Sequence, residues 1–290
     1  IQGIAEAEKF KAKRFVTTIS EHPSQGGALT CLAQKGADVL LAESEKSGGR
    51  VCLEALEKQC AGVLLGAFSL VESETGVVQN AKEIGGILHA NGALFHLDAT
   101  QAAGKIPIAD MNADTISFSP HKYYGLNGIA FLAKKKDLVI APLIKGGGNL
   151  TPLRSGTISL PLLLANEEAT RIAANERSTR FKMVDALNAL LRARLSEIES
   201  INVNSPVDAL PHILNLSFKN ADGKEARQYL YAHGICVSHK SACSAPDLPS
   251  KAVFNLTQSK KLAQNSFRVS LSHLTTETDL SALIEVIKQI

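Results

Sequence analysis

Short apolar runs alternate with stretches of helical spacing through the first half of the chain. Runs without polar alternation, such as AGVLLGAF at 61–68, indicate strands that are buried on both faces. Because helical stretches separate these runs, the pattern predicts a parallel or mixed sheet covered by helices. The expected strands are 15–20, 37–44, 61–68, 93–99, 114–119 and 128–133, and the expected helices are 26–34, 51–60 and 80–91.

The pattern changes after Gly156. Residues 160–200 are rich in Ala, Leu, Glu and Arg with almost no Gly or Pro, which is typical of long helices. The remaining chain mixes strands and helices, so we expect a large domain over 1–178 and a smaller α+β domain over 179–290. In this second part the expected strands are 212–218, 235–238 and 267–272, and the expected helices are 224–234 and 276–290, the latter capped by Thr275 or Thr276.

Composition narrows the class of protein. The 290 residues are 45% hydrophobic and 20% charged, which is typical of a globular protein with room for two domains. The net charge of +3 is mild, and no Lys/Arg cluster is interleaved with aromatic residues, so we expect no nucleic-acid partner. No apolar run reaches the length that spans a bilayer, so we expect no membrane partner either.

The five cysteines bear on the compartment and on metal binding. They form no CxxC pair, which argues against zinc-ribbon and thioredoxin-like sites, and we expect no metal. Their odd number and long spacing suit free thiols in a reducing compartment, so we expect the protein in the cytoplasm.

Two polar side chains follow neighbouring expected strands, where ligands of open α/β sheets bind. Asp98 lies near the end of the expected strand 93–99, after its apolar residues, and Lys122 follows the strand 114–119 in the stretch SFSPHKYYG. Each has an ordinary interpretation, because Asp98 can cap the next helix and the Lys122 stem can pack on a strand end. Together they match pyridoxal 5'-phosphate, which needs a lysine amine for its Schiff base and an acidic residue at its pyridine nitrogen. Ser119 and His121 flank the lysine and can donate hydrogen bonds to a phosphate.

Six separated motifs carry a family resemblance over almost the whole chain. They are HLDATQAAGKIP, SFSPHKYYGLNGIAFL, KGGGNLTPLRSGT, LPHILNLSF, VSHKSACSAPDLPS and SFRVSLSHLTTETDL, in this order. The chain closely resembles the cysteine desulfurases of the class V aminotransferase group. The resemblance implies an α/β fold of type I, a three-layer sandwich with a mainly parallel sheet plus a smaller α+β C-terminal domain. It also implies a homodimer that binds pyridoxal 5'-phosphate.

The activity that the resemblance implies is conversion of L-cysteine to L-alanine. The sulfur passes to an enzyme cysteine as a persulfide and then to a sulfur-acceptor or scaffold protein, for iron–sulfur cluster or thio-cofactor biosynthesis. Lys122 would hold the cofactor and move the substrate α-proton, Asp98 would pair with the pyridinium nitrogen, and Gln101 would bond the ring hydroxyl. Ser119 and His121 would hold the phosphate.

Four further residues receive roles from the resemblance. His22 would stack on the pyridine ring, although by itself it suits the start of a helix. Thr157 would reach the phosphate bound by the partner subunit. Arg268 would bind the substrate carboxylate bidentately, a task that suits a guanidinium group. Ser73 stands where the family has a substrate-contacting asparagine.

Cys243 matches the sulfur-accepting cysteine of the family. Its surroundings, SACSAP, are small and polar and are followed by Asp and two prolines, so we expect an exposed, mobile loop. His239 and Lys240 are near in sequence and would favour the thiolate. Cys236, in the expected strand 235–238, is predicted to be a buried core thiol.

The chain departs from the family pattern in places. Glu72 precedes Ser73 in VESETGVVQ, which adds a carboxyl group where a substrate carboxylate is expected, and Lys145 replaces a histidine. The chain starts at Ile1 with helical spacing, so we expect that N-terminal sequence is missing. The resemblance implies that a phosphate-binding loop, which opens a helix, lies just before this position. Two alternatives therefore stay open: a related pyridoxal-phosphate lyase or class V aminotransferase, such as a selenocysteine lyase, and a non-catalytic homologue that acts as an interaction protein.

Overall fold

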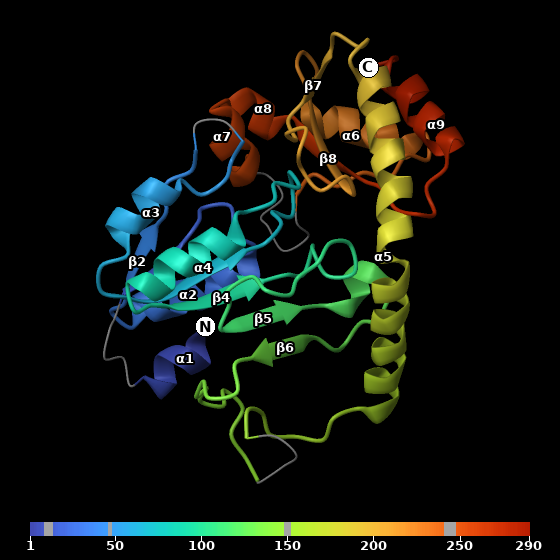
Figure 1. The fold of residues 1–290 in the computed structure, drawn as a ribbon. Helices are drawn as coiled ribbons and strands as arrows, with labels where there is room; N and C mark the ends of the chain where they lie inside the picture. Colours follow the sequence, from blue (N-terminus) through green and yellow to red (C-terminus); the bar gives the residue numbers. More distant parts are fainter. Residues whose placement is uncertain (9–13, 46–47, 148–151, 241–247) are drawn as a thin grey trace. The chain divides into compact units, whose positions relative to one another are not determined.

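The computed structural model describes residues 1–8, 14–45, 48–147, 152–240 and 248–290, and these form two compact units (Figure 1). The first unit comprises Ile1–Glu43, Val51–Leu70 and Asn80–Asn175. The second unit comprises Ser44–Arg50, Val71–Gln79 and Glu176–Ile290. Nothing in the hydrophobic pattern sets the two short segments of the second unit, 44–50 and 71–79, apart from their surroundings.

The first unit is built on a mainly parallel sheet, as the sequence predicts. Within the described residues its strand order is β2-β1-β3-β4-β5-β6, with the first five parallel and β6 antiparallel to β5. Every expected strand of the first half is present. The bounds are β1 Arg14–Thr17, β2 Asp38–Leu41, β3 Val63–Ser69, β4 Leu94–Asp98, β5 Thr115–Phe118 and β6 Phe131–Lys134.

Helices cover this sheet, and the expected helices of the first half are present. They are α1 Gln2–Ala7, α2 Pro23–Gln34, α3 Leu53–Gln59 and α4 Ala81–Ala90, with a 3-10 turn η1 at Pro120–Tyr123. Helix α2 begins earlier than expected because His22 caps it: the Nδ1 atom of His22 accepts the Ser24 N–H at 3.2 Å, and Pro23 occupies the first helical position. Helix α4 packs closely on β3, since a Cβ on Gly66 would lie 2.5 Å from Leu88 Cδ1.

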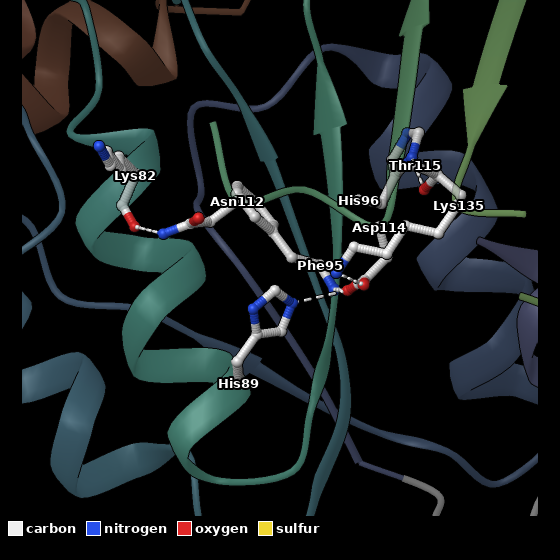
Figure 2. Close-up of polar contacts among 8 residues, drawn as sticks. All are labelled: Lys82, His89, Phe95, His96, Asn112, Asp114, Thr115 and Lys135. Atoms are coloured by element: carbon white, nitrogen blue, oxygen red, sulfur yellow. Dashed lines mark hydrogen bonds and ion pairs between the residues drawn. The ribbon is translucent and has the colours of Figure 1, made fainter. Parts of the chain in front are cut away.

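A buried carboxyl group fastens the amino edge of the sheet (Figure 2). The Asp114 side chain is only 5% exposed, and it accepts hydrogen bonds from the Phe95 N–H at 2.7 Å, His89 Nε2 at 2.9 Å and Lys135 Nζ at 2.6 Å. Burial alone would raise the pKa of Asp114, but these hydrogen bonds outweigh it and lower the pKa. The cluster therefore ties α4, β4 and the segment after β6 together at the edge opposite Asp98.

The second unit contains an antiparallel sheet with the order β7-β8-β9 in its described residues. The strands are β7 Ile201–Val203, β8 Ile213–Phe218 and β9 Ser266–Ser270. The helices are α6 Gly223–Ala232, α7 Lys251–Thr257, α8 Lys260–Gln264 and α9 Glu277–Ile287. Thr276 caps α9 as expected and forms a capping box with Asp279. The short elements β7, α7 and α8 are not among the sequence predictions.

One long helix, α5 Leu160–Leu195, has its first part in the first unit and the rest, from Glu176, in the second. This helix confirms the prediction of long helical structure over residues 160–200. No helix in the described part of the chain is both long enough and apolar enough to cross a membrane.

The predictions for segment 235–238 are wrong. It is not a strand, and only Ser238 forms an isolated bridge with Arg268. Ile235 and Val237 pack against the core of the second unit, so Cys236 between them points outward and is exposed rather than buried.

Candidate active site

Asp98 is the last residue of β4 and lies at the carboxyl edge of the first sheet. The residue is 9% exposed, and its Oδ1 atom accepts the Thr100 N–H at 2.9 Å. The sheet register places Asp98 beside Ser69 at the end of β3 and beside Ser117 on β5. The strand edge therefore presents a carboxyl group between two hydroxyl-bearing residues.

Lys122 lies on the 3-10 turn that directly follows β5. Its backbone N–H bonds to the Ser119 carbonyl at 3.1 Å, and the Gly125 N–H bonds to the Pro120 carbonyl at 2.9 Å. A Cβ on Gly125 would lie 2.4 Å from Asn166 Oδ1, so the turn closes tightly against α5. The Lys122 side chain is exposed in this turn. The turn follows β5, which pairs with β4, the strand that carries Asp98.

Lys122 also acts on its neighbour His121. Burial, together with the positive charge of Lys122, lowers the pKa of His121 from 6.5. At neutral pH the imidazole is therefore uncharged and can donate one hydrogen bond. Ser119 is the N-cap of the turn and partly buried, so both residues predicted to hold a phosphate lie on the same turn as Lys122.

The loop after β1 carries an acidic residue that the sequence analysis did not single out. Glu21 Oε2 accepts the Ser69 N–H at 2.9 Å, the Ser69 hydroxyl at 2.5 Å and Gln25 Nε2 at 2.6 Å, while Oε1 accepts the Thr18 hydroxyl at 2.9 Å. Burial raises the pKa of Glu21 to about 7, with a further contribution from the charge of Asp98. In the sequence, Glu21 could have been recognised as a candidate only from its position directly before His22 and after a buried strand.

This loop and the first turn of α2 contain two polar atoms without a hydrogen-bond partner among the residues that the structure describes. Ser20 Oγ and Gln25 Oε1 are buried and have no hydrogen-bond partner within the described ranges. Buried polar atoms usually have a hydrogen-bond partner, so these two leave positions that a water molecule or a polar ligand can fill. The residues present therefore suit a polar cofactor held by an amine and a carboxylate at adjacent strand ends.

Two further predicted cofactor residues belong to the first unit. Gln101 follows β4, and both its side-chain Oε1 and its carbonyl oxygen accept hydrogen bonds from Lys105 Nζ, at 3.2 and 3.0 Å. Thr157 is exposed on the segment that precedes α5. The sheet thus brings Asp98, Gln101 and Lys122 to one edge, while Thr157 is on a separate segment.

The predicted substrate residues lie in the second unit. Arg268, on β9, donates from Nη1 to the Ser73 carbonyl at 2.7 Å, so these two residues meet through the backbone of Ser73. Burial lowers the pKa of Arg268, and the negative charges of Glu72 and Glu74 oppose that shift. Arg268 Nε is buried with no hydrogen-bond partner in the part of the chain that the structure describes.

Cys243, the predicted sulfur acceptor, lies outside the described residues. Of the two residues expected to favour its thiolate, Lys240 is buried and donates from Nζ to the Leu248 carbonyl at 2.5 Å. His239 is partly buried. Across the described ranges, no group of three or more His, Cys, Asp or Glu side chains is arranged to hold a metal ion.

Comparisons with known proteins identify the family and the fold. The family model described as aminotransferase class-V matches residues 1–283. The chain is 33% identical to the cysteine desulfurase IscS of Glaesserella parasuis serovar 5 over 298 residues, which cover 100% of this chain and 73% of that protein. A solved structure described as a NifS-like protein matches with a TM-score of 0.91 and 28% identity, over 99% of this chain and 77% of the other. The NifS-like protein from Rickettsia africae matches with a TM-score of 0.85 and 26% identity, over 99% and 78%.

Proposed function

The chain belongs to the aminotransferase class-V family, and from that membership we propose that it is a cysteine desulfurase. In the proposed reaction L-cysteine and the thiol of Cys243 give L-alanine and a Cys243 persulfide. A carbon–sulfur bond breaks, a sulfur–sulfur bond forms, and the carbon that loses sulfur gains a proton. The observation that carries the proposal is the placement of Asp98 and Lys122 at the ends of adjacent strands β4 and β5.

The cofactor of this family, pyridoxal 5'-phosphate, fits the residues of the first unit. Lys122 would hold it through Nζ, Asp98 would face the pyridine nitrogen, and Ser119 with His121 would bond the phosphate. Ser20 Oγ and Gln25 Oε1, which are buried and have no hydrogen-bond partner among the described residues, are consistent with a polar ligand at the same edge. When bound, the protonated ring supplies an electron sink for the bond-breaking steps.

The chain's own residues would orient the substrate and move its protons. The Lys122 amine would act as the base for the substrate α-proton. The charge of Asp98 would keep a proton on the ring nitrogen, and Gln101 would donate to the ring hydroxyl. His22 would cover the ring face; its Nδ1 accepts the Ser24 N–H, so a neutral imidazole carries its proton on Nε2.

Residues of the second unit would bind the substrate carboxylate and accept the substrate sulfur. Arg268 would bind the carboxylate, with the Ser73 region next to it. Cys243 would attack the substrate sulfur and pass the persulfide sulfur to an acceptor or scaffold protein, for iron–sulfur cluster or thio-cofactor assembly. Free thiols at Cys31, Cys52, Cys60 and Cys236 suit a reducing cytoplasm.

We also propose a homodimer in which Thr157 bonds the phosphate in the partner's site. A single stretch of the first unit, within residues 124–164, exposes many large apolar side chains, as a subunit interface requires. They include Leu126, Leu143, Ile144, Ile158, Leu160 and Leu164. The oligomeric state in solution tests this part of the proposal.

The test of the activity is alanine release from L-cysteine by the protein loaded with pyridoxal 5'-phosphate, and sulfide release when a thiol reductant is added to cleave the persulfide. Lys122→Ala should abolish both, and borohydride reduction should attach the cofactor to Lys122 in the unchanged protein, as read by peptide mass. Cys243→Ser should stop alanine formation, whereas Cys236→Ser, which alters an exposed thiol of the same unit, should not. Full alanine production by Cys243→Ser would refute the assignment of Cys243 as the sulfur acceptor.

The same assays distinguish the two alternative functions. Alanine release from selenocysteine but not from cysteine would favour a selenocysteine lyase, and absence of bound cofactor would favour a non-catalytic homologue.

A further inference from the structure

A buried carboxyl group caps the turn on which Arg268 docks. Glu72 is 6% exposed, and its Oε1 atom accepts the Glu74 N–H at 2.9 Å. Its Oε2 atom accepts both the N–H and the hydroxyl of Thr75, each at 2.6 Å. The backbone closes the same turn, because the Gly76 N–H bonds to the Glu72 carbonyl at 3.0 Å. The carboxyl group is therefore fixed in place by its own loop.

Arg268 contacts this turn and shares its electrostatic environment. Its Nη1 atom donates to the Ser73 carbonyl, one residue after Glu72, and the negative charges of Glu72 and Glu74 act on the guanidinium group. Its buried Nε has no hydrogen-bond partner within the described segments, which leaves a donor for a ligand. Glu74 is also buried, and its Oε2 atom accepts the Ser250 hydroxyl at 2.5 Å.

This arrangement places two buried carboxyl groups beside one guanidinium group. With both ionised, the three groups carry one net negative charge, which opposes the approach of a carboxylate ligand in a low-dielectric setting. With one proton added to the carboxyl pair, the three groups are neutral and the opposition is removed. Burial, followed by the charge of Glu74, raises the pKa of Glu72 to about 7, so this proton is available near neutral pH.

We propose that Glu72 links carboxylate binding at Arg268 to proton uptake, so that a monocarboxylate binds together with up to one proton on Glu72. The assignment of Arg268 as the carboxylate-binding group rests on the proposed function. The consequence for that function is a substrate affinity that weakens as the pH rises above neutrality.

Other ionisable groups lie on the segments packed around Arg268. His239 follows Ser238, which bridges Arg268 through the backbone, and the Nζ atom of the next residue, Lys240, donates to the Leu248 carbonyl. A proton taken up by His239 would persist when Glu72 is replaced. Substitution at position 72 therefore separates the two sources.

The experiment is calorimetric titration of the full chain with propionate, with and without pyridoxal 5'-phosphate. Propionate has a carboxylate and no amine, so its binding requires no reaction. Titrations in two buffers of different ionisation enthalpy give the number of protons taken up. Because Glu72, with a pKa of about 7, already holds about half a proton at pH 7, we expect uptake of up to about one half of a proton at pH 7 and close to one at about pH 8. The affinity should fall up to about tenfold per pH unit above neutrality.

Two variants with matched side-chain length complete the test. Glu72→Asn and Glu72→Asp both keep an oxygen that can cap the turn, in the manner of short side chains that bond the N–H groups two and three residues on. Glu72→Asn should bind propionate more tightly at pH 8 and lose the pH dependence, whereas Glu72→Asp should retain it.

Three results would overturn the proposal: no propionate binding at any pH, no proton uptake by the unchanged protein, or uptake that persists in Glu72→Asn. If Glu72→Asn does not fold, Glu72→Gln, which keeps the full side-chain length and a capping oxygen but has no ionisable group, replaces it in the test. An inactive protein that still shows the proton-linked binding would refute the cysteine desulfurase proposal and leave the linkage standing.

Discussion

Glu21 Oε2 accepts both the backbone N–H of Ser69, at 2.9 Å, and its hydroxyl, at 2.5 Å. This pair joins the loop after β1 to the end of β3, and the sheet register sets Ser69 directly beside Asp98. A partly buried acid thus fixes the loop that carries His22. Its pKa of about 7, against an ordinary value of 4.5, makes it sensitive to pH in the neutral range.

Replacing Glu21 with Gln should reduce the pH dependence of stability. The folded protein holds a proton on Glu21 more tightly than the unfolded chain, so its stability falls as pH rises from 4.5 through about 7. The upper bound for this loss is about 3 kcal/mol. We expect the difference in Tm between pH 5 and pH 8 to be smaller in Glu21→Gln. Glu54→Gln, on an exposed position of α3, is the control, and an equal pH dependence in all three proteins would contradict the expectation.

Asp98→Asn should remove the negative charge of the side chain while keeping its hydrogen bond to the Thr100 N–H. An amide oxygen can still accept the Thr100 N–H, so we expect the same Tm and the same cofactor content as in the unchanged protein. The negative charge is lost, and alanine formation should fall by about 100-fold or more, as for removal of other preorganised electrostatic groups. Stopped assays of alanine release, normalised to bound cofactor, measure this. A rate within a few fold of the unchanged protein would remove Asp98 from the proposed mechanism.

Asp114→Asn should destabilise the first unit by about 3 kcal/mol, because it breaks a buried, charge-assisted cluster. The lowered pKa of Asp114 means that its contribution is present above its unfolded pKa and is lost as pH falls through the folded value. Lys135→Met removes a partner that is 56% exposed and should cost less than about 1 kcal/mol. Chemical unfolding at pH 7 compares them, and equal costs would show that the ion pair, rather than the buried carboxyl, carries the stability.

Two adjacent glycines of α4 should respond in opposite directions to alanine. A Cβ on Gly85 would lie 2.6 Å from Asn112 Cβ and 2.9 Å from its carbonyl oxygen, so Gly85→Ala should cost about 1–3 kcal/mol. Gly86 has no atom within 4 Å of its added Cβ, so Gly86→Ala should stabilise the helix by up to about 1 kcal/mol. Thermal unfolding of the two variants checks this, and a stabilising Gly85→Ala would show that α4 can move away from Asn112.

The sheet and part of the candidate site were predictable because both depend on local pattern. Apolar runs without alternating polar residues predicted the parallel strands. The polar residues at or just after the ends of these runs predicted Asp98 and Lys122 as site residues. Glu21 lies in an equivalent place, but a single acid after a strand is ordinary, and only the folded contacts with Ser69 distinguish it.

Features that depend on distant parts of the chain were not predictable. The exposure of Cys236 follows from Ile235 and Val237 packing inward on a segment that has no full strand partner. Likewise, the acidic cap at Glu72 becomes informative only when Arg268, nearly two hundred residues later, docks on its turn. Hydrophobic periodicity contains no signal for such pairings.

The assignment of segment 71–79 to the second unit has a consequence for how this protein can be divided. Glu74 and Gly76 supply partners to Asn215, Ser250 and Leu210, through the Glu74 carbonyl, the Glu74 carboxyl group and the Gly76 carbonyl. A gene cut between codons 175 and 176 would therefore produce a C-terminal polypeptide with open polar positions in its interior. During synthesis, segment 71–79 leaves the ribosome long before its hydrogen-bond partners in the last third of the chain. The second unit can therefore complete its folding only after most of the protein has been synthesised.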